Sequence, residues 1–225
     1  MAIDRYSIYR QYIEEQRAEY ERAIIEIHEI VQKLRDGIII NGKKIKIKDA
    51  VKVEGRIKAF DSAFKNDRTE KKKLDDCFGI RVVTENKLSA IVIKEIIRRL
   101  NNSDIRKALC MADGADYNVE EEKNHAKREG TEYNAVHQII TRSTENEMSP
   151  LIEIQYWDKE LEERCTYGDL SHGGYKKEKL KEVMNGMIGK ELPEYYDFDG
   201  NGKLKILSKE EAIKKMFPKK EEKER

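Results

Sequence analysis

Two acidic residues, Asp76 and Glu153, lie where a metal-dependent site would need them. Asp76 comes two residues before the apolar run FGIRVVT (78–84), and Glu153 lies between Ile152 and Ile154. Two carboxylates on neighbouring strands that point to one face could bind Mg²⁺ together with substrate phosphates, as phosphoryl-transfer enzymes do. Either acid alone is better explained as a solvent-facing strand residue.

Basic residues gather just before and within the same apolar run. Arg56, Lys58, Lys65 and Arg68 precede it, and Arg81 lies inside it. A buried guanidinium needs an anion, or an aromatic or base face, as its partner. Arginine suits nucleotides because it binds in a bidentate manner and stacks, whereas lysine binds phosphate as a point charge. Surface ion pairing with neighbouring acids is the alternative explanation of Arg56, Lys58 and Arg81.

A tyrosine and a histidine four residues apart form a third group. Tyr133 and His137 fall on one face of a predicted strand. There the phenol ring could stack on a base, and the imidazole could contact phosphate or ribose. A core tyrosine beside a hydrogen-bonded histidine is the alternative. His172 and the pair Tyr175 and Lys176 add a further polar group in a predicted helical region.

Composition and missing motifs exclude several classes of protein. The sequence has neither a GxxxxGK[ST] phosphate loop nor the His-Asp pair that a metal-dependent phosphohydrolase needs. Lys and Arg total 45 against 44 Asp and Glu, and this net charge of +1 argues against DNA held by a large positive field. No apolar stretch approaches the roughly 20 residues of a membrane helix. With three scattered cysteines, we expect a reduced, cytoplasmic protein with no membrane or DNA partner.

Helices and strands in alternation must position these residues. Residues 4–36 have helical spacing of apolar residues up to Gly37, and the next twelve residues alternate around Asn41 and Gly42, a strong hairpin signal. Further predicted elements are helices over 55–66, 87–100 and 158–190, the last interrupted near 171–176, and strands over 78–84, 116–122, 132–142 and 150–157. This order predicts an α+β fold with a mixed β-sheet flanked by helices.

The chain is expected to divide into four segments: an N-terminal helix and hairpin (1–48), a central domain (49–190), a C-terminal hairpin with a short helix (191–217) and a disordered tail (218–225). In the third segment, Asp197 begins a match to the first half of a calcium-binding EF-hand loop. The twelfth position of that loop is Ser208 instead of the closing glutamate. Two short strands, YYDFD and KLKIL, explain the pattern better.

Five short motifs follow one another in an order typical of one family. RIKAFDSAFK, DDCFGIR, EYNAVH, IEIQ and SHGGYK together resemble the synthetase domain of the RelA/SpoT family, the (p)ppGpp synthetases. The resemblance covers about residues 50–180. It implies a nucleotidyltransferase-like synthetase fold, and the length of the chain is similar to the small, synthetase-only branch.

The resemblance also implies a set of ATP-binding residues. Arg56 and Arg81 resemble the arginine pair that sandwiches the adenine of ATP. Lys58 and Ser62 look like phosphate ligands. Lys65 joins them one residue before the position where the family usually has a lysine.

For the metal and the acceptor, the resemblance implies a second set. Asp76 resembles the Mg²⁺ carboxylate, and Glu153 resembles the acid that binds metal or activates the acceptor hydroxyl. Tyr133 looks like the platform for the guanine base, with His137 beside its phosphates. Supporting acceptor positions are Gln155, His172 and Lys176.

The implied reaction is transfer of the β,γ-pyrophosphate of ATP to the 3′-oxygen of GDP or GTP, which leaves AMP. The sequence departs from the family pattern at Asn66, Glu132 and Ala135, and at the position usually held by arginine after the IEIQ motif. Two alternatives therefore stay open: a toxic relative that modifies the 3′ CCA end of tRNA, and a catalytically degenerate nucleotide-binding module. By resemblance alone, such small proteins often form homo-oligomers.

Overall fold

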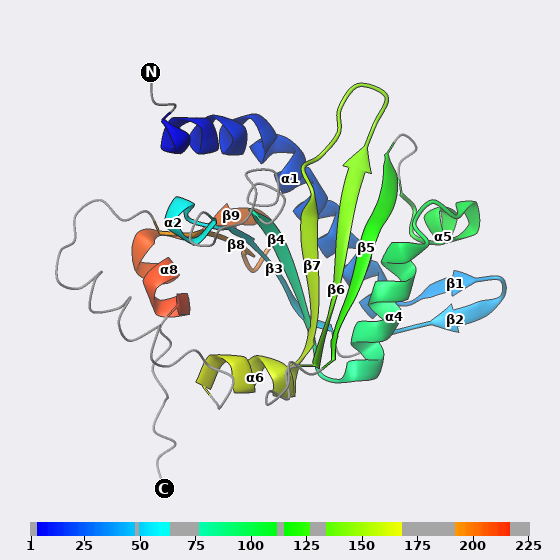
Figure 1. The fold of residues 1–225 in the computed structure, drawn as a ribbon. Helices are drawn as coiled ribbons and strands as arrows, with labels where there is room; N and C mark the ends of the chain where they lie inside the picture. The colour runs from blue at the N-terminus through cyan, green and yellow to red at the C-terminus, as the bar shows by residue number, and fades with distance from the viewer. Residues whose placement is uncertain are drawn as a thin grey trace, which may run out of the picture.

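The computed structural model describes residues 4–47, 50–63, 77–111, 115–126, 134–167 and 192–216. Its centre is a twisted seven-stranded sheet with the strand order β5-β6-β7-β4-β3-β8-β9 (Figure 1). The strands are β3 (Ala50–Ile57), β4 (Phe78–Thr84), β5 (Asp116–Ala126), β6 (Asn134–Ser143), β7 (Ile152–Asp158), β8 (Glu194–Phe198) and β9 (Leu204–Ile206). β4 and β7 are parallel and the other neighbours are antiparallel, so the predicted mixed sheet is confirmed.

The described helices are α1 (Arg5–Asp36), α2 (Phe60–Ala63), α4 (Lys87–Arg98), α5 (Ser103–Ala108), α6 (Lys159–Tyr167) and α8 (Lys209–Met216). Asp4 caps the N-terminus of α1, where its carboxylate accepts a hydrogen bond from the backbone N–H of Tyr6 (3.1 Å), and Gly37, with φ 102°, caps the C-terminus. The predicted helices over 4–36 and 87–100 are thus confirmed. Only α6 is described from the predicted helix over 158–190, and 168–190 lie outside the described residues.

A separate hairpin, β1 (Ile38–Ile40) and β2 (Lys43–Ile45), follows α1 and projects from the body of the molecule (Figure 1). Its turn has positive φ at Asn41 (50°) and Gly42 (75°), the pair that a tight two-residue hairpin requires. The C-terminal hairpin β8–β9 is also present, as predicted, and it joins the large sheet beside β3.

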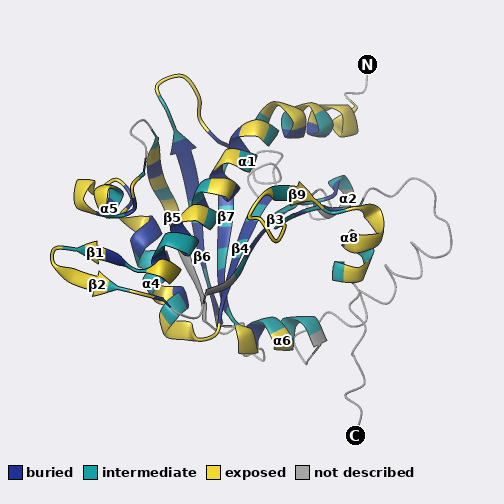
Figure 2. Cartoon of the chain, turned by 180° about the vertical axis from the view of Figure 1, so that it is seen from behind, coloured by how far each residue is buried: buried dark blue, intermediate teal, exposed yellow. Residues whose placement is uncertain are grey.

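The two faces of the sheet differ in polarity because side chains alternate along each strand. One face is apolar and packs against α1 and α4, where buried residues dominate the strands (Figure 2). Buried members of this core on the strands include Val53, Ile57, Ile80, Val82, Ile154, Tyr156, Ile140 and Tyr196. The opposite face of the central strands is polar, and α6 and α8 contact it.

The helix predicted over 55–66 is wrong for its first part. Residues 50–57 form β3, an interior strand paired with both β4 and β8, and the described part of the predicted helix is α2. Val53 and Ile57 are buried on the apolar face while Glu54 and Arg56 lie on the polar face, which is the period of a strand. Residues 64–66 lie outside the described residues.

Gly55 explains why this strand is hard to recognise. Gly55 lies on the apolar face, close to α1. A Cβ atom at this residue would lie 2.5 Å from Ile24 Cδ1 and 2.8 Å from the Tyr20 hydroxyl. Glycine lowers strand propensity, but here it permits close contact between helix and sheet. The Tyr20 hydroxyl uses this proximity: it accepts from the backbone N–H of Arg56 (2.8 Å) and donates to the carbonyl of Gly79 (2.6 Å).

A buried ion network also binds α1 to the sheet. Arg142 on β6 donates to Glu19 (3.0 Å) and Glu26 (2.7 Å) on α1, and Tyr117 on β5 donates to Glu26. Burial raises the pKa of Tyr117, as does the adjacent carboxylate. In the part of the chain that the structure describes, no helix combines the length and apolar character needed to cross a membrane.

Candidate functional site

Four polar residues form one row across four strands of the polar face. In the sheet register, Glu54 on β3 pairs with Arg81 on β4, Arg81 pairs with Gln155 on β7, and Gln155 pairs with His137 on β6. Such neighbours lie about 5 Å apart, so their side chains can form one continuous network. The row therefore brings together three predicted site residues from separate sequence motifs.

A second row lies two residues along the strands. Arg56 on β3 pairs with Gly79 on β4, which pairs with Glu153 on β7. Gly79 contributes no side chain to the centre of this row. Lys58 follows β3, and its charge acts on the Glu153 carboxylate. The acidic Glu153 and the basic residues Arg56 and Lys58 thus lie across the same part of the sheet from one another.

Glu153 is held by two neighbours. His137 Nδ1 lies 2.9 Å from Oε1, and Gln155 Nε2 donates to Oε2 at 2.8 Å. Burial alone would raise the pKa of Glu153, but the hydrogen bonds from His137 and Gln155 and the charge of Lys58 outweigh it and lower the pKa to about 2. Glu153 is therefore ionised at neutral pH, and His137 Nδ1 carries the proton between them.

Arg81 is fixed on three sides. Its Nη1 donates to Glu54 Oε1 (3.2 Å), while Nε and Nη2 both donate to Gln155 Oε1 (3.4 and 3.3 Å). The guanidinium carbon lies 3.6 Å from the centre of the Trp157 ring, so one face of its plane is stacked on the indole. The sequence prediction that Arg81 needs an anion or an aromatic partner is met by both.

Glu54 is a buried carboxylate surrounded by cations. Its side chain is 6% exposed, and its oxygens lie 3.2 Å from Arg81, 2.5 Å from Lys215 of α8 and 3.7 Å from Lys52. Burial would raise the pKa of Glu54, but these three cations lower it. Lys52 also pairs with Glu162 of α6. Charges around Glu54 therefore hold both α6 and α8 against the polar face.

The predicted site residues divide into those that the structure brings together and those it does not describe. Brought together on the polar face or at its edge are Arg56, Lys58, Arg81, His137, Glu153 and Gln155. Ser62 lies in α2, and its side chain is not described. Outside the described residues are Lys65, Asp76, Tyr133, His172 and Lys176.

Sequence reasoning missed three residues of this site: Glu54, Trp157 and Lys215. Glu54 was not identified because residues 49–54 were assigned to no element and a helix was predicted from residue 55; in a strand, Glu54 shares a face with Arg56 two residues later. Trp157 shares a face with Gln155 by the same rule, so alternation along the predicted strand 150–157 could have identified it. Lys215 had no such signal, because α8 reaches the site only through the tertiary fold.

The donor set fits Mg²⁺ bound with substrate phosphates. Oε1 of Glu153 contacts His137 and Oε2 accepts from Gln155. A carboxylate has about four lone-pair positions, so it can bind a cation besides these two partners. Mg²⁺ commonly takes one or two carboxylates and completes its shell with water and phosphate oxygens. Among the described residues, no group of three or more acidic, His or Cys side chains is arranged to hold a metal ion without such help.

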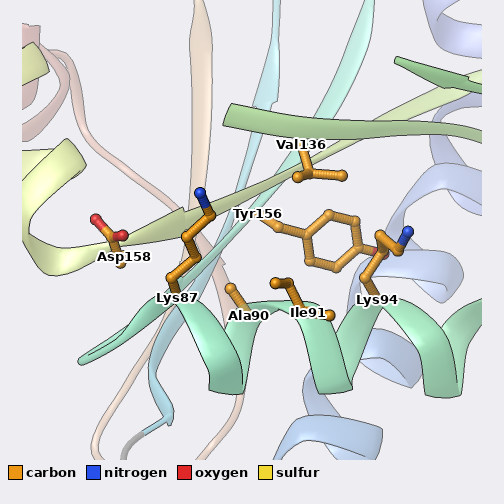
Figure 3. Close-up of a pocket in the computed structure, with 7 residues that line it drawn as sticks. All are labelled: Lys87, Ala90, Ile91, Lys94, Val136, Tyr156 and Asp158. Atoms are coloured by element: carbon orange, nitrogen blue, oxygen red, sulfur yellow. The ribbon is translucent and has the colours of Figure 1, made fainter. Parts of the chain in front are cut away.

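A small pocket lies elsewhere, between α4 and strands β6 and β7 (Figure 3). Its lining is Lys87, Ala90, Ile91, Lys94, Val136, Tyr156 and Asp158. Val136 and Tyr156 belong to the α4 side of the sheet, so the pocket opens on the face opposite Glu153. It does not belong to the site on the polar face.

Comparisons with known proteins agree with the motifs. Residues 43–180 match a family model described as the region found in RelA / SpoT proteins. The fold is similar to the crystal structure of small alarmone synthetase 1 from Bacillus subtilis, with 15% identity, a TM-score of 0.52, and coverage of 78% of this chain and 86% of that one. The structure of that synthetase bound to its product pppGpp has 15% identity, a TM-score of 0.51, and coverage of 81% and 97%. No curated protein matches the chain.

Proposed function

The chain belongs to the RelA/SpoT family, and from this premise we propose that it is an ATP-dependent pyrophosphotransferase that makes (p)ppGpp from GDP or GTP and releases AMP. One observation supports this most directly: an ionised, oriented carboxylate, Glu153, lies across from Arg56 and Lys58 on one face of the sheet. The B. subtilis synthetase of similar fold is bound to pppGpp in one of its structures, which supports a guanine nucleotide as acceptor.

The β3 and β4 side of the site suits ATP. Arg56 and Arg81 would stack on the adenine ring, and Lys58 would bind the phosphates, where its compact charge is most useful. Ser62 and Lys65 complete the proposed donor site by resemblance. Phosphoryl chemistry of this kind depends on orientation and charge stabilisation, which the cations Arg56, Lys58 and Arg81 would provide.

Glu153 is better suited to bind a cation than to accept a proton. A carboxylate with a pKa of about 2 is a weak base at neutral pH. We assign it, with Asp76, as a ligand of Mg²⁺, which when bound would neutralise phosphate charge during transfer. Glu153 also orients the His137 imidazole through Nδ1.

The β6 and β7 side of the site would take the acceptor. His137 and Gln155 lie there, and Tyr133, His172 and Lys176 are assigned to it by resemblance. Ala135, where the family pattern has serine, is fully buried in a cluster with Trp157. That position therefore offers no hydroxyl to an acceptor.

Incubation with γ-labelled ATP, Mg²⁺ and one acceptor at a time tests the proposed function. We expect label on the 3′-oxygen of GDP or GTP, with equal amounts of AMP, and none on deacylated tRNA. Label on tRNA instead would support the toxic alternative. Label on neither acceptor would leave the degenerate nucleotide-binding module.

A further inference from the structure

Trp157, the single tryptophan of the chain, is 6% exposed and lies directly against Arg81. It pairs with Val83 on β4 and therefore lies two residues along the sheet from the Arg81–Gln155 pair. From this diagonal position the indole covers one face of the guanidinium plane. Leu161 of α6 and Val83 belong to the same buried apolar cluster as the indole.

The edges of the same guanidinium are held by Glu54 and Gln155. With one face on the indole and two edges hydrogen-bonded, the Arg81 plane has a fixed orientation before any ligand arrives. Its side chain remains 28% exposed. Trp157 covers one face of the guanidinium plane. The opposite face is therefore the one that can stack on a base.

Arg56 lies in a suitable position on the far side of such a base. It pairs with Gly79, so it is a diagonal neighbour of Arg81, and diagonal neighbours on adjacent strands are roughly 7–8 Å apart. A base stacked between two guanidinium planes needs about twice the 3.6 Å spacing that Arg81 already keeps from Trp157. The sheet register therefore fits one planar ring between the two arginines.

We propose that Trp157 and Glu54 are positioning residues that hold the Arg81 guanidinium as a preformed platform for the adenine of the donor nucleotide. This inference rests on the proposed function, because it assigns Arg81 to the ATP side of the site. Ordering a long arginine side chain costs conformational entropy, and here that entropy is already lost in the free protein. The consequence is tighter binding of adenine without any direct contact from Trp157.

Binding of α,β-methylene-ATP, which cannot release AMP, tests the platform without requiring transfer. In the wild-type protein, saturation should change the fluorescence of Trp157, and calorimetry should give the same dissociation constant. Trp157→Leu should weaken binding roughly 3- to 30-fold, the range expected for loss of a cation–π contact. Trp157→Phe keeps an aromatic face and should recover most of the affinity.

Leu161→Ala provides the matched control. It removes packing from the same cluster but leaves the indole that covers the guanidinium, so binding of the analogue should change less than twofold at a temperature where the protein is folded. Equal losses in Trp157→Leu and Leu161→Ala would show that Trp157 only supports the fold and would overturn the proposal. Affinity for GDP should be unchanged in both variants.

Two double-mutant cycles separate positioning from direct contact. If Trp157 and Glu54 act through Arg81, then Trp157→Leu and Glu54→Gln should have little further effect in an Arg81→Ala background. Additive losses would contradict the proposal. Failure of the proposed function would give a different result. The protein would bind α,β-methylene-ATP with an affinity that depends on Trp157, and yet it would transfer no pyrophosphate from ATP to GDP or GTP. Absence of any binding to the wild-type protein would overturn both.

Discussion

At the scale of single residues, Glu153 is the group on which the proposed chemistry depends most. Glu153→Gln keeps the size of the side chain but removes the charge that a cation would bind. We expect the rate of pyrophosphate transfer to fall by at least about 100-fold, while affinity for α,β-methylene-ATP changes little because adenine is recognised by other residues. Glu85→Gln, a change at an exposed acid paired with Lys159, is the control and should leave the rate unchanged. A Glu153→Gln enzyme with most of its turnover would remove Glu153 from the site.

Because the pKa of Glu153 is low, we expect the free energy of unfolding to depend on pH. The pKa of Glu153 is about 2 in the folded protein against 4.5 as the ordinary value, so the folded state favours the ionised form. The resulting stabilisation, at most about 3 kcal/mol, is fully present above pH 4.5 and is lost as the pH falls towards 2. The difference in free energy of unfolding between wild type and Glu153→Gln, measured by urea denaturation, should therefore shrink between pH 5 and pH 3. A constant difference would show that the charge does not contribute.

Much of the site could be predicted from residue types in ordered motifs. Arg81 and Glu153 stand out because a charge in an apolar strand needs a partner, and Arg56 because it belongs to the basic cluster that precedes the strand 78–84. The structure places all three on one face. Glu54 and Trp157 could not be predicted in the same way. A glutamate just before a predicted helix and a tryptophan in a core strand both have ordinary explanations, and only the register places them beside Arg81.

At the scale of elements, the contact between α1 and the strand pair β3–β4 supports the site from behind. The Tyr20 hydroxyl satisfies the backbone N–H of Arg56 and the carbonyl of Gly79 in a fully buried position. Tyr20→Phe would leave both groups without this partner, and we expect a loss of about 1–3 kcal/mol in the free energy of unfolding. Tyr6→Phe, at a half-exposed position of the same helix, is the control for denaturant melts and should cost less than about 0.5 kcal/mol. Equal stability of the two variants would contradict this role.

For the C-terminal hairpin β8–β9, we predict that calcium does not bind. Asp199 Oδ1 accepts from the backbone N–H groups of Asn201 (2.8 Å) and Lys203 (2.9 Å), and Gly202 has φ 75°, so this carboxylate shapes a turn. Asp197 lies 3.7 Å from Lys215. Calorimetry with millimolar calcium should show no saturable heat. A micromolar isotherm that Asp197→Ala abolishes would instead make the hairpin a calcium site.

The error over β3 has a physical cause at this scale. A glycine within an alternating run weakens the strand signal, and the prediction assigned 49–54 to no element and began a helix at residue 55. Pairing partners on both sides overrode the local preference, because an interior strand gains hydrogen bonds and burial from β4 and β8 together. Elements with their own strong periodicity, such as α1 and α4, depended less on this context and were predicted well.

At the scale of the whole molecule, the C-terminal segment contributes to the site from a distance in sequence. β8 pairs with β3 at Arg56, and α8 places Lys215 on Glu54. The order of helices and strands predicted a mixed sheet, but not that residues near 195 and 215 lie beside residues near 55. Such contacts arise when the fold closes, and no local pattern encodes them.

The central claim is that this face of the sheet transfers pyrophosphate from ATP to a guanine nucleotide. The most direct measurement is a transfer assay with ATP labelled in its β- and γ-phosphates, Mg²⁺ and GDP, with the product position mapped by nuclease digestion. We expect one AMP for each GDP modified, both labelled phosphates on the 3′-oxygen, and transfer by Glu153→Gln slower by at least about 100-fold. Hydrolysis of ATP without a labelled guanine nucleotide, or equal product from the Glu153→Gln protein, would contradict it.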